Sequence, residues 1–164
     1  MKLILIRQTE DGTVPAGTKK GNAAAYRVYT GTAPAGRETA QALFALPAPP
    51  VETPLLDETP QPETGLRGKL SARRAARRRA GEFLDRLEKE AFDSVVICGG
   101  GAMSALKAVL RVRGYTLEGG GLVPRPLERV RATKRSLHCG GCARNCLLSE
   151  ARCEKGKNKA RGIR

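Results

Sequence analysis

The residues with the clearest chemical potential are cysteines in the last quarter of the chain. Four of the five cysteines follow the pattern C-x2-C-x3-C-x6-C. Thiolates at such short spacing can close a tetrahedral shell around Zn²⁺ or hold an iron–sulfur cluster without a large supporting fold. We therefore expect a metal site, with Zn²⁺ favoured over iron–sulfur, and the alternative is a reduced tail without metal. The expected ligands are Cys139, Cys142, Cys146 and Cys153.

A second candidate site lies where residues 94–98 meet three consecutive glycines. The apolar run is too short for a helix and too continuous for a strand with one exposed face, so it predicts a buried strand of a parallel sheet. Apolar residues at helical spacing follow over 102–110. A strand that turns into a helix through Gly99, Gly100 and Gly101 directs backbone N–H groups and the positive end of the helix dipole at one place. This turn predicts an anion site, or else only a tight connection.

Two arginines earlier in the chain also lie at predicted junctions, one at the end of a strand and one at the start of a helix. The run 2–7 predicts a central parallel strand that delivers Arg7 and Gln8 at its C-terminal end, where ligands bind in open α/β sheets. A second strand is predicted over 26–30, followed by a turn and a helix over 37–46 with Arg37 at its start. Planar guanidinium groups suit the binding of oxyanions through paired hydrogen bonds.

Three segments resemble, in the same order, the signatures of the histidine phosphatase (phosphoglycerate mutase-like) superfamily. They are L-I-L-I-R followed by Gln8, T-G-T-A-P-A-G-R-E-T-A-Q-A-L over 30–43, and V-V-I-C-G-G-G-A-M-S-A-L over 95–106. The family has R-H-G after its first strand, S-x-x-x-R-x-x-x-T-A entering a helix, and S-H-G-G-x-x-R-x-L after a later strand. The resemblance covers about residues 1–115. It implies a three-layer α/β/α fold with a mostly parallel central sheet, in which Arg7 and Arg37 hold a phosphoryl group.

The departures from the family pattern fall on its chemistry. Gln8 stands where the family has its nucleophilic histidine, Gly99 where it has its second histidine, and Cys98 replaces a serine. An amide is neither basic nor nucleophilic, so Gln8 cannot form a phosphohistidine. The resemblance therefore implies a catalytically inactive protein that binds a phosphorylated small molecule or another anion. The expected anion-binding residues are Arg7, Gln8, Arg37, Cys98, Gly99 and Gly100.

Two further features of the sequence bear on this site. In the family, a loop corresponding to the proline-rich stretch 47–62 often brings an acid to the site, and the candidates are Asp57, Glu58 and Glu63. Cys98 itself suggests a phosphocysteine mechanism, because a thiol at a helix start among arginines can be activated. However, the arginine that such phosphatases carry six residues later is replaced by Ser104. We therefore expect Cys98 to be a small buried strand residue.

The charge balance favours acidic partners. The 164 residues carry 30 Lys and Arg against 16 Asp and Glu, a formal net charge of +14. The length predicts one domain with an appendage, which we divide into an α/β domain over 1–131 and a basic, Cys-rich tail over 132–164. The N-terminal apolar run is too short for a signal peptide, and no stretch is long enough to span a membrane. We expect a cytoplasmic protein without membrane association.

A predicted helix from Ser71, a plausible N-cap, to about Glu90 carries an arginine run without acids in its first half. The run is interpreted as a solvated face, with contact to a phosphate backbone as the alternative. If the second interpretation holds, the protein is a nucleic-acid-binding protein whose functional surface is this helix together with the Cys-rich tail.

Overall fold

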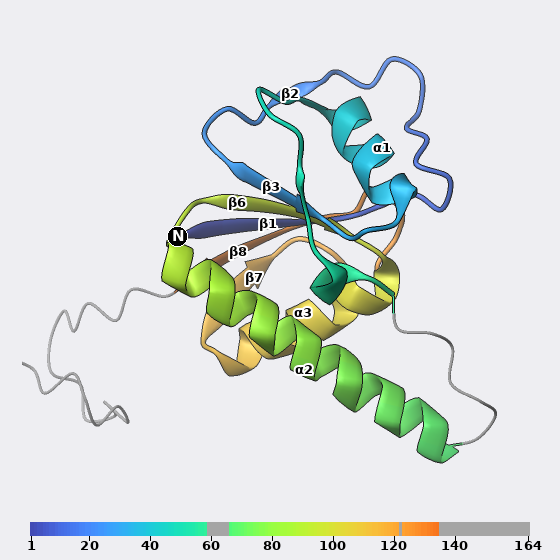
Figure 1. Ribbon diagram of the computed structural model, residues 1–164, viewed down its shortest axis with the longest axis vertical. Coiled ribbons are helices and arrows are strands. Elements are labelled where there is room, and N and C mark those ends of the chain that lie inside the picture. Colours follow the sequence, from blue (N-terminus) through green and yellow to red (C-terminus); the bar gives the residue numbers. More distant parts are fainter. Residues whose placement is uncertain (59–65, 122, 135–164) are drawn as a thin grey trace, which may run out of the picture.

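The computed structural model describes residues 1–58, 66–121 and 123–134, and shows an α/β fold with a mostly parallel central sheet (Figure 1). The strand order is β5-β3-β6-β1-β8-β7, in which β5, β3, β6 and β1 are parallel and β8 and β7 are antiparallel to their neighbours. The elements are β1 (Lys2–Arg7), β2 (Gly21–Asn22), β3 (Arg27–Thr30), α1 (Pro34–Leu43), β4 (Phe44–Ala45), β5 (Val51–Glu52), the 3-10 turn η1 (Pro54–Leu56), α2 (Leu66–Glu90), β6 (Ser94–Cys98), α3 (Gly100–Val112), β7 (Tyr115–Glu118) and β8 (Arg129–Lys134).

Strands β1 and β6 form the centre of the sheet because their side chains are covered on both faces. Leu5 and Val96 point to the face covered by α2 and α3, whereas Ile6 and Ile97 point to the face covered by α1. Every residue of β6 is buried. The prediction of buried parallel strands at 2–7 and 94–98 is therefore confirmed, and helices lie on both faces of the sheet.

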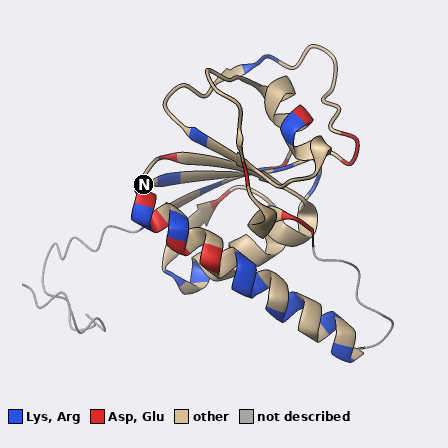
Figure 2. Ribbon diagram, viewed as in Figure 1, with Lys and Arg blue, Asp and Glu red and all other residues tan. Residues whose placement is uncertain are grey.

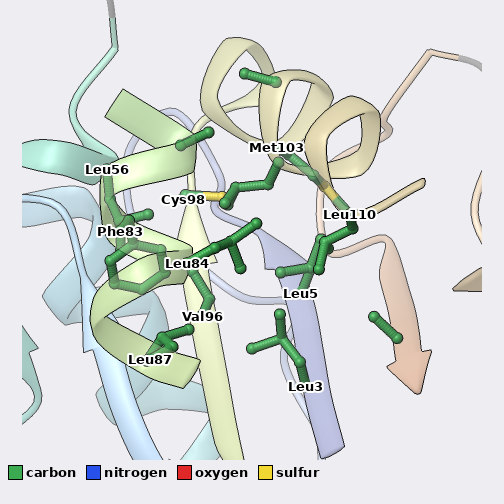
Figure 3. Packing of buried hydrophobic residues seen from close by; sticks show 14 of the residues in the cluster. Leu3, Leu5, Leu56, Phe83, Leu84, Leu87, Val96, Cys98, Met103 and Leu110 are labelled. Carbon is green, nitrogen blue, oxygen red and sulfur yellow. The ribbon is translucent and has the colours of Figure 1, made fainter. Parts of the chain in front are cut away.

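The larger core lies between the sheet and the helices α2 and α3 (Figure 3). The ring of Phe83 meets the ring of Tyr29 edge to face, with centroids 5.5 Å apart, and Leu84 and Leu87 extend the same stripe of α2. Leu56 of η1 is buried against this stripe and fastens the proline-rich connection to the body. None of the helices within the described ranges is long and apolar enough to cross a membrane.

Three boundaries differ from the sequence-based expectation. The helix expected over 37–46 is α1, which begins with Pro34 at a position where a missing N–H costs nothing. Ser71 is not an N-cap, since α2 begins at Leu66 and the Ser71 hydroxyl donates to the carbonyl of Gly68 at 3.0 Å. Strand β8 was not expected, and it carries the sheet through the proposed boundary at 131 as far as Lys134.

A buried ion pair fastens the segment before β8 to α3. The Lys107 ammonium lies 3.0 Å from Glu128 Oε1 and donates to the carbonyl of Gly121 at 2.8 Å, and both charged side chains are less than one-tenth exposed. Burial raises the pKa of Glu128, but backbone hydrogen bonds and Lys107 outweigh it and hold that pKa below its ordinary value. The native chain therefore gains stability from Glu128 above the ordinary carboxyl pKa and loses it as the pH falls.

We predict that Lys107→Met lowers the free energy of unfolding by about 3 kcal/mol or more at neutral pH, because it leaves a buried carboxylate without its cation. The loss should shrink as the pH falls and Glu128 is protonated. Urea denaturation followed by circular dichroism measures both effects. The matched control is Lys89→Met on the exposed side of α2, which should change stability by less than about 0.5 kcal/mol. Equal losses in the two variants would contradict the prediction.

Candidate anion-binding site

The carboxyl ends of β1 and β6 place the first group of predicted site residues together. Arg7 is the register partner of Cys98, and the backbone N–H of Gln8 donates to the carbonyl of Cys98 at 3.0 Å. The chain turns directly from Cys98 through Gly99 into α3. Both strands thus end at the same edge of the sheet, where Arg7 lies at the start of α3 and the Gln8 side chain lies at the start of α1.

Arg7 lies over the first turn of α3. Its Nε atom is 3.2 Å from the position that a Cβ atom would take at Gly100, so the guanidinium group rests against the helix backbone. Its Nη1 donates to the carbonyl of Pro124. The backbone of Arg7 also donates to Glu128 O at 3.0 Å and accepts from Leu127 N at 2.9 Å. The segment 124–128 therefore braces Arg7, and it is this segment that the Lys107–Glu128 pair fastens.

A carboxylate of the chain itself occupies the start of α3. The Gly101 N–H donates to Glu58 Oε1 at 3.1 Å, and any Cβ atom at Gly99 would overlap the Glu58 carboxylate. The positive end of the helix dipole and the free N–H groups of the first turn favour a negative charge here. A side chain at position 99 would displace the Glu58 carboxylate from this place. Of the two candidate acids within the described residues, Glu58 reaches the glycine turn and Asp57 does not. The third candidate, Glu63, lies outside the described residues.

The neighbouring acid, Asp57, serves the other helix start. Its Oδ1 accepts from the backbone N–H of Thr32 at 2.6 Å, and its Oδ2 accepts from the Thr32 hydroxyl at 2.6 Å. Thr32 lies in the loop between β3 and α1. Two consecutive carboxylates thus bind the loop before α1 and the first turn of α3, which lie on opposite faces of the sheet.

Gln8 faces the first turn of α1. Its Oε1 atom lies 3.0 Å from the position of a Cβ atom at Gly36, and the Cβ atom of Thr30 lies 3.4 Å from the same position. The Thr30 hydroxyl is buried and is the side-chain polar atom for which the described residues offer no hydrogen-bond partner. The position at which the resembled family has its nucleophilic histidine therefore holds a neutral amide beside the start of α1.

Arg37 does not contact the other site residues through any interaction seen in the described part of the chain. Its Nε donates to Glu52 Oε1 at 2.7 Å, and about half of its side chain is exposed. The structure thus brings together Arg7, Gln8, Cys98, Gly99 and Gly100, and it holds Arg37 one residue beyond Gly36 in an ion pair with β5. Neither Glu52 nor the brace at 124–128 was predicted from the sequence, because local patterns give no sign of which distant residues will meet.

Cys98 is a core residue. Its side chain points between Met103 and the α2 stripe (Figure 3) and is fully buried. Burial, together with the negative charge of Glu58, raises the pKa of the Cys98 thiol to about 12. A protonated, buried thiol is a poor nucleophile, so the geometry favours the structural interpretation of Cys98 over a phosphocysteine mechanism.

The predicted metal ligands Cys139, Cys142, Cys146 and Cys153 all lie outside the described residues. Within residues 1–58, 66–121 and 123–134, no three His, Cys, Asp or Glu side chains are grouped so that they could hold a metal ion.

We predict that Cys98 in the folded protein resists alkylation by iodoacetamide at pH 8, since its thiol is neither accessible nor ionised. Peptide mapping by mass spectrometry should find the Cys98 peptide unlabelled in native protein and fully labelled in guanidinium chloride. Rapid labelling of this peptide under native conditions would contradict the burial of Cys98.

A search of protein-family models and a search of curated proteins found no match to this chain. The resemblance to the histidine phosphatases therefore depends on the three segments quoted above and on their order.

Proposed function

We propose that this protein is a non-catalytic member of the histidine phosphatase type, with a phosphoglycerate mutase-like arrangement of its layers, that binds a phosphate-bearing small molecule or a related anion. The binding residues are Arg7 and the backbone of Gly99, Gly100 and Gly101, with Gln8 and Arg37 beside them. The observation that carries the proposal is the Glu58 carboxylate on the Gly101 N–H. The start of α3 already accommodates an anion, and a cation rests against the same turn.

The absence of phosphoryl transfer is proposed from the chemistry of two side chains. Gln8 has no lone pair basic enough to attack phosphorus. Cys98 is held as a buried thiol with a raised pKa. The groups at this edge suit recognition, since guanidinium and backbone N–H groups donate hydrogen bonds to an oxyanion without reacting with it.

To bind an external anion, one or two of the site residues must give up the hydrogen-bond partner that they have in this structure. Glu58 must leave the Gly101 N–H, and Arg37 contributes only if it turns from Glu52 to the ligand. Arg37 is exposed enough for such a rotation, whereas Arg7 is fixed by Pro124. We therefore assign the first contact with the ligand to Arg7 and α3, and the second to Arg37. We also propose that the protein is located in the cytoplasm, where phosphorylated metabolites are found.

We predict that Glu58→Gln binds inorganic phosphate about fivefold to tenfold more tightly than the native chain, because a competing carboxylate becomes a weaker, neutral acceptor. Arg7→Ala should weaken binding about tenfold. Isothermal titration calorimetry at millimolar phosphate measures both changes.

The matched control for this experiment is Asp57→Asn, which removes the same charge one residue away but leaves the Glu58 carboxylate on α3. It should not improve phosphate binding as Glu58→Gln does. If both variants gained the same phosphate affinity, the gain would come from the change in net charge and the prediction would be contradicted. Binding that is indifferent to Arg7→Ala would contradict the assigned pocket.

For the tail, we propose one Zn²⁺ bound by Cys139, Cys142, Cys146 and Cys153, with an iron–sulfur cluster as the alternative. The support is the cysteine spacing alone. Zinc accepts four thiolates at any spacing that closes a tetrahedron and needs no assembly machinery, whereas a cluster adds visible absorption.

We predict one zinc per chain and no colour in protein purified without oxygen, by elemental analysis and visible spectroscopy. Replacing Cys139 and Cys142 with serine should abolish zinc binding, whereas the control Cys98→Ala should retain it. Stoichiometric iron with sulfide would move the assignment to a cluster. Protein without any metal would refute both.

A further inference from the structure

The first half of α2 is uniformly basic. Residues 66–79 contain no Asp or Glu, and the helix has no acid in its first turn. In Figure 2 this half of the helix carries only blue charged residues, and acids begin in the half that packs on the body. We call residues 66–79 the basic segment. Its cations are Arg67, Lys69, Arg73, Arg74, Arg77, Arg78 and Arg79.

The basic segment projects beyond the domain. In Figure 1 this end of α2 extends past the other described elements, and none of residues 66–79 is buried. Burial begins at Ala80, and the fully covered side chains of the helix, Phe83, Leu84 and Leu87, all belong to its second half. The core therefore holds the second half of α2, and in the first half Ala76 packs against it while the side chains of Arg73, Arg74, Arg77 and Arg78 are exposed.

The placement of the cations does not serve the stability of the helix. Lys69, Arg73 and Arg77 are four residues apart, as are Arg74 and Arg78, so like charges are neighbours along two rows. Cations near a helix N-terminus also oppose the helix dipole. Among these cations, Arg78 forms an exposed ion pair with Glu82 one turn later, at 3.6 Å and in the less favourable order for a helix. The acids further along α2 pair with cations of the same helix or of other elements, as Glu90 does with Arg86 and Arg27. A polyanion bound along the two rows would offset both kinds of repulsion.

We propose that the basic segment binds the phosphate backbone of double-stranded nucleic acid. This surface is separate from the small-anion site proposed above, which lies at the glycine turn of α3. The segment is about 20 Å long at the helical rise, enough to follow several phosphates of one strand. Arginine, which is its main cation, suits phosphate through paired hydrogen bonds.

The other side chains of the basic segment favour a duplex as the partner. Beyond the exposed Leu66 and Leu70, the uncharged residues among the cations are small (Ser71, Ala72, Ala75 and Ala76), so the helix over residues 71–78 is slim enough to approach a groove or backbone closely. The segment has no aromatic residue on which unpaired bases could stack, which disfavours single strands. Contacts to phosphate alone carry no sequence information, so we expect little preference among sequences.

The test is fluorescence anisotropy with the full chain and labelled duplexes of about 20 base pairs, two of DNA with unrelated sequences and one of RNA. The test variant changes Arg73, Arg74, Arg77 and Arg78 to Gln, which keeps helix propensity. The matched control removes the same charge from exposed positions elsewhere, by changing Lys19, Lys20, Arg111 and Arg131 to Gln. Circular dichroism checks that both variants fold.

At about 50 mM salt the test variant should bind duplexes at least about tenfold more weakly than the native chain, and its slope of log affinity against log salt should fall by about 3 to 4. The control variant should stay within about threefold of the native chain. The proposal is supported if DNA or RNA duplexes bind the native chain and the test variant shows this loss of affinity and of salt dependence. A preference for one duplex would show whether the partner is DNA or RNA. Equal losses in the two variants would overturn it, as would equal affinity for an oligothymidine strand. Equal affinity for polyglutamate would assign the segment to an acidic protein instead.

Discussion

The parallel pairing of β1 with β6 is the constraint on which the rest of the structure depends. Both strands are covered on both faces, so their interiors must be apolar and their polar residues are confined to the ends. The register sets Arg7 beside Cys98 and therefore fixes which residues emerge together. Everything that can recognise a ligand at this edge, from the guanidinium group to the glycine turn, follows from where these two strands stop.

The edge formed in this way is not an open anion cradle. The first turn of a helix has backbone N–H groups that need hydrogen-bond acceptors. Here the connection after β5 supplies carboxylate oxygens as those acceptors. Glu58 stands on α3 and Asp57 on the loop before α1. A ligand for this edge therefore competes with a carboxylate that is already present at high local concentration. Such competition favours ligands with more negative charge than a single carboxylate, and phosphate esters meet that requirement.

The sequence predicted the elements whose signal is local. Unbroken apolar runs identified β1 and β6, because strands buried on both faces need such runs. Strand β8 escaped prediction because exposed Arg129 and Arg131 alternate with buried Val130 and Ala132, so the segment has no unbroken apolar run, and it crosses the expected domain boundary at 131. The start of α2 was missed for a related reason, since a projecting helix has no apolar stripe to reveal it.

Apart from the meeting of β1 with β6, the contacts between distant side chains could not be predicted. The family resemblance suggested three acids for the site, but it could not choose between Asp57 and Glu58, whose side chains serve opposite faces of the sheet. The partnership of Arg37 with Glu52 and the brace of Arg7 by Pro124 depend on folding of the whole chain. Placement of the cysteine ligands stays a prediction, because it lies outside the described residues.

The adjacency of Asp57 and Glu58 links the two faces of the sheet. A single peptide unit joins the carboxylate that binds Thr32 to the one that binds Gly101, and Leu56 anchors the preceding turn in the core. A shift of the backbone at these two residues would therefore alter both contacts at once. The connection after β5 thus links the start of α1 to the start of α3 through two neighbouring side chains, without direct contact between the helices.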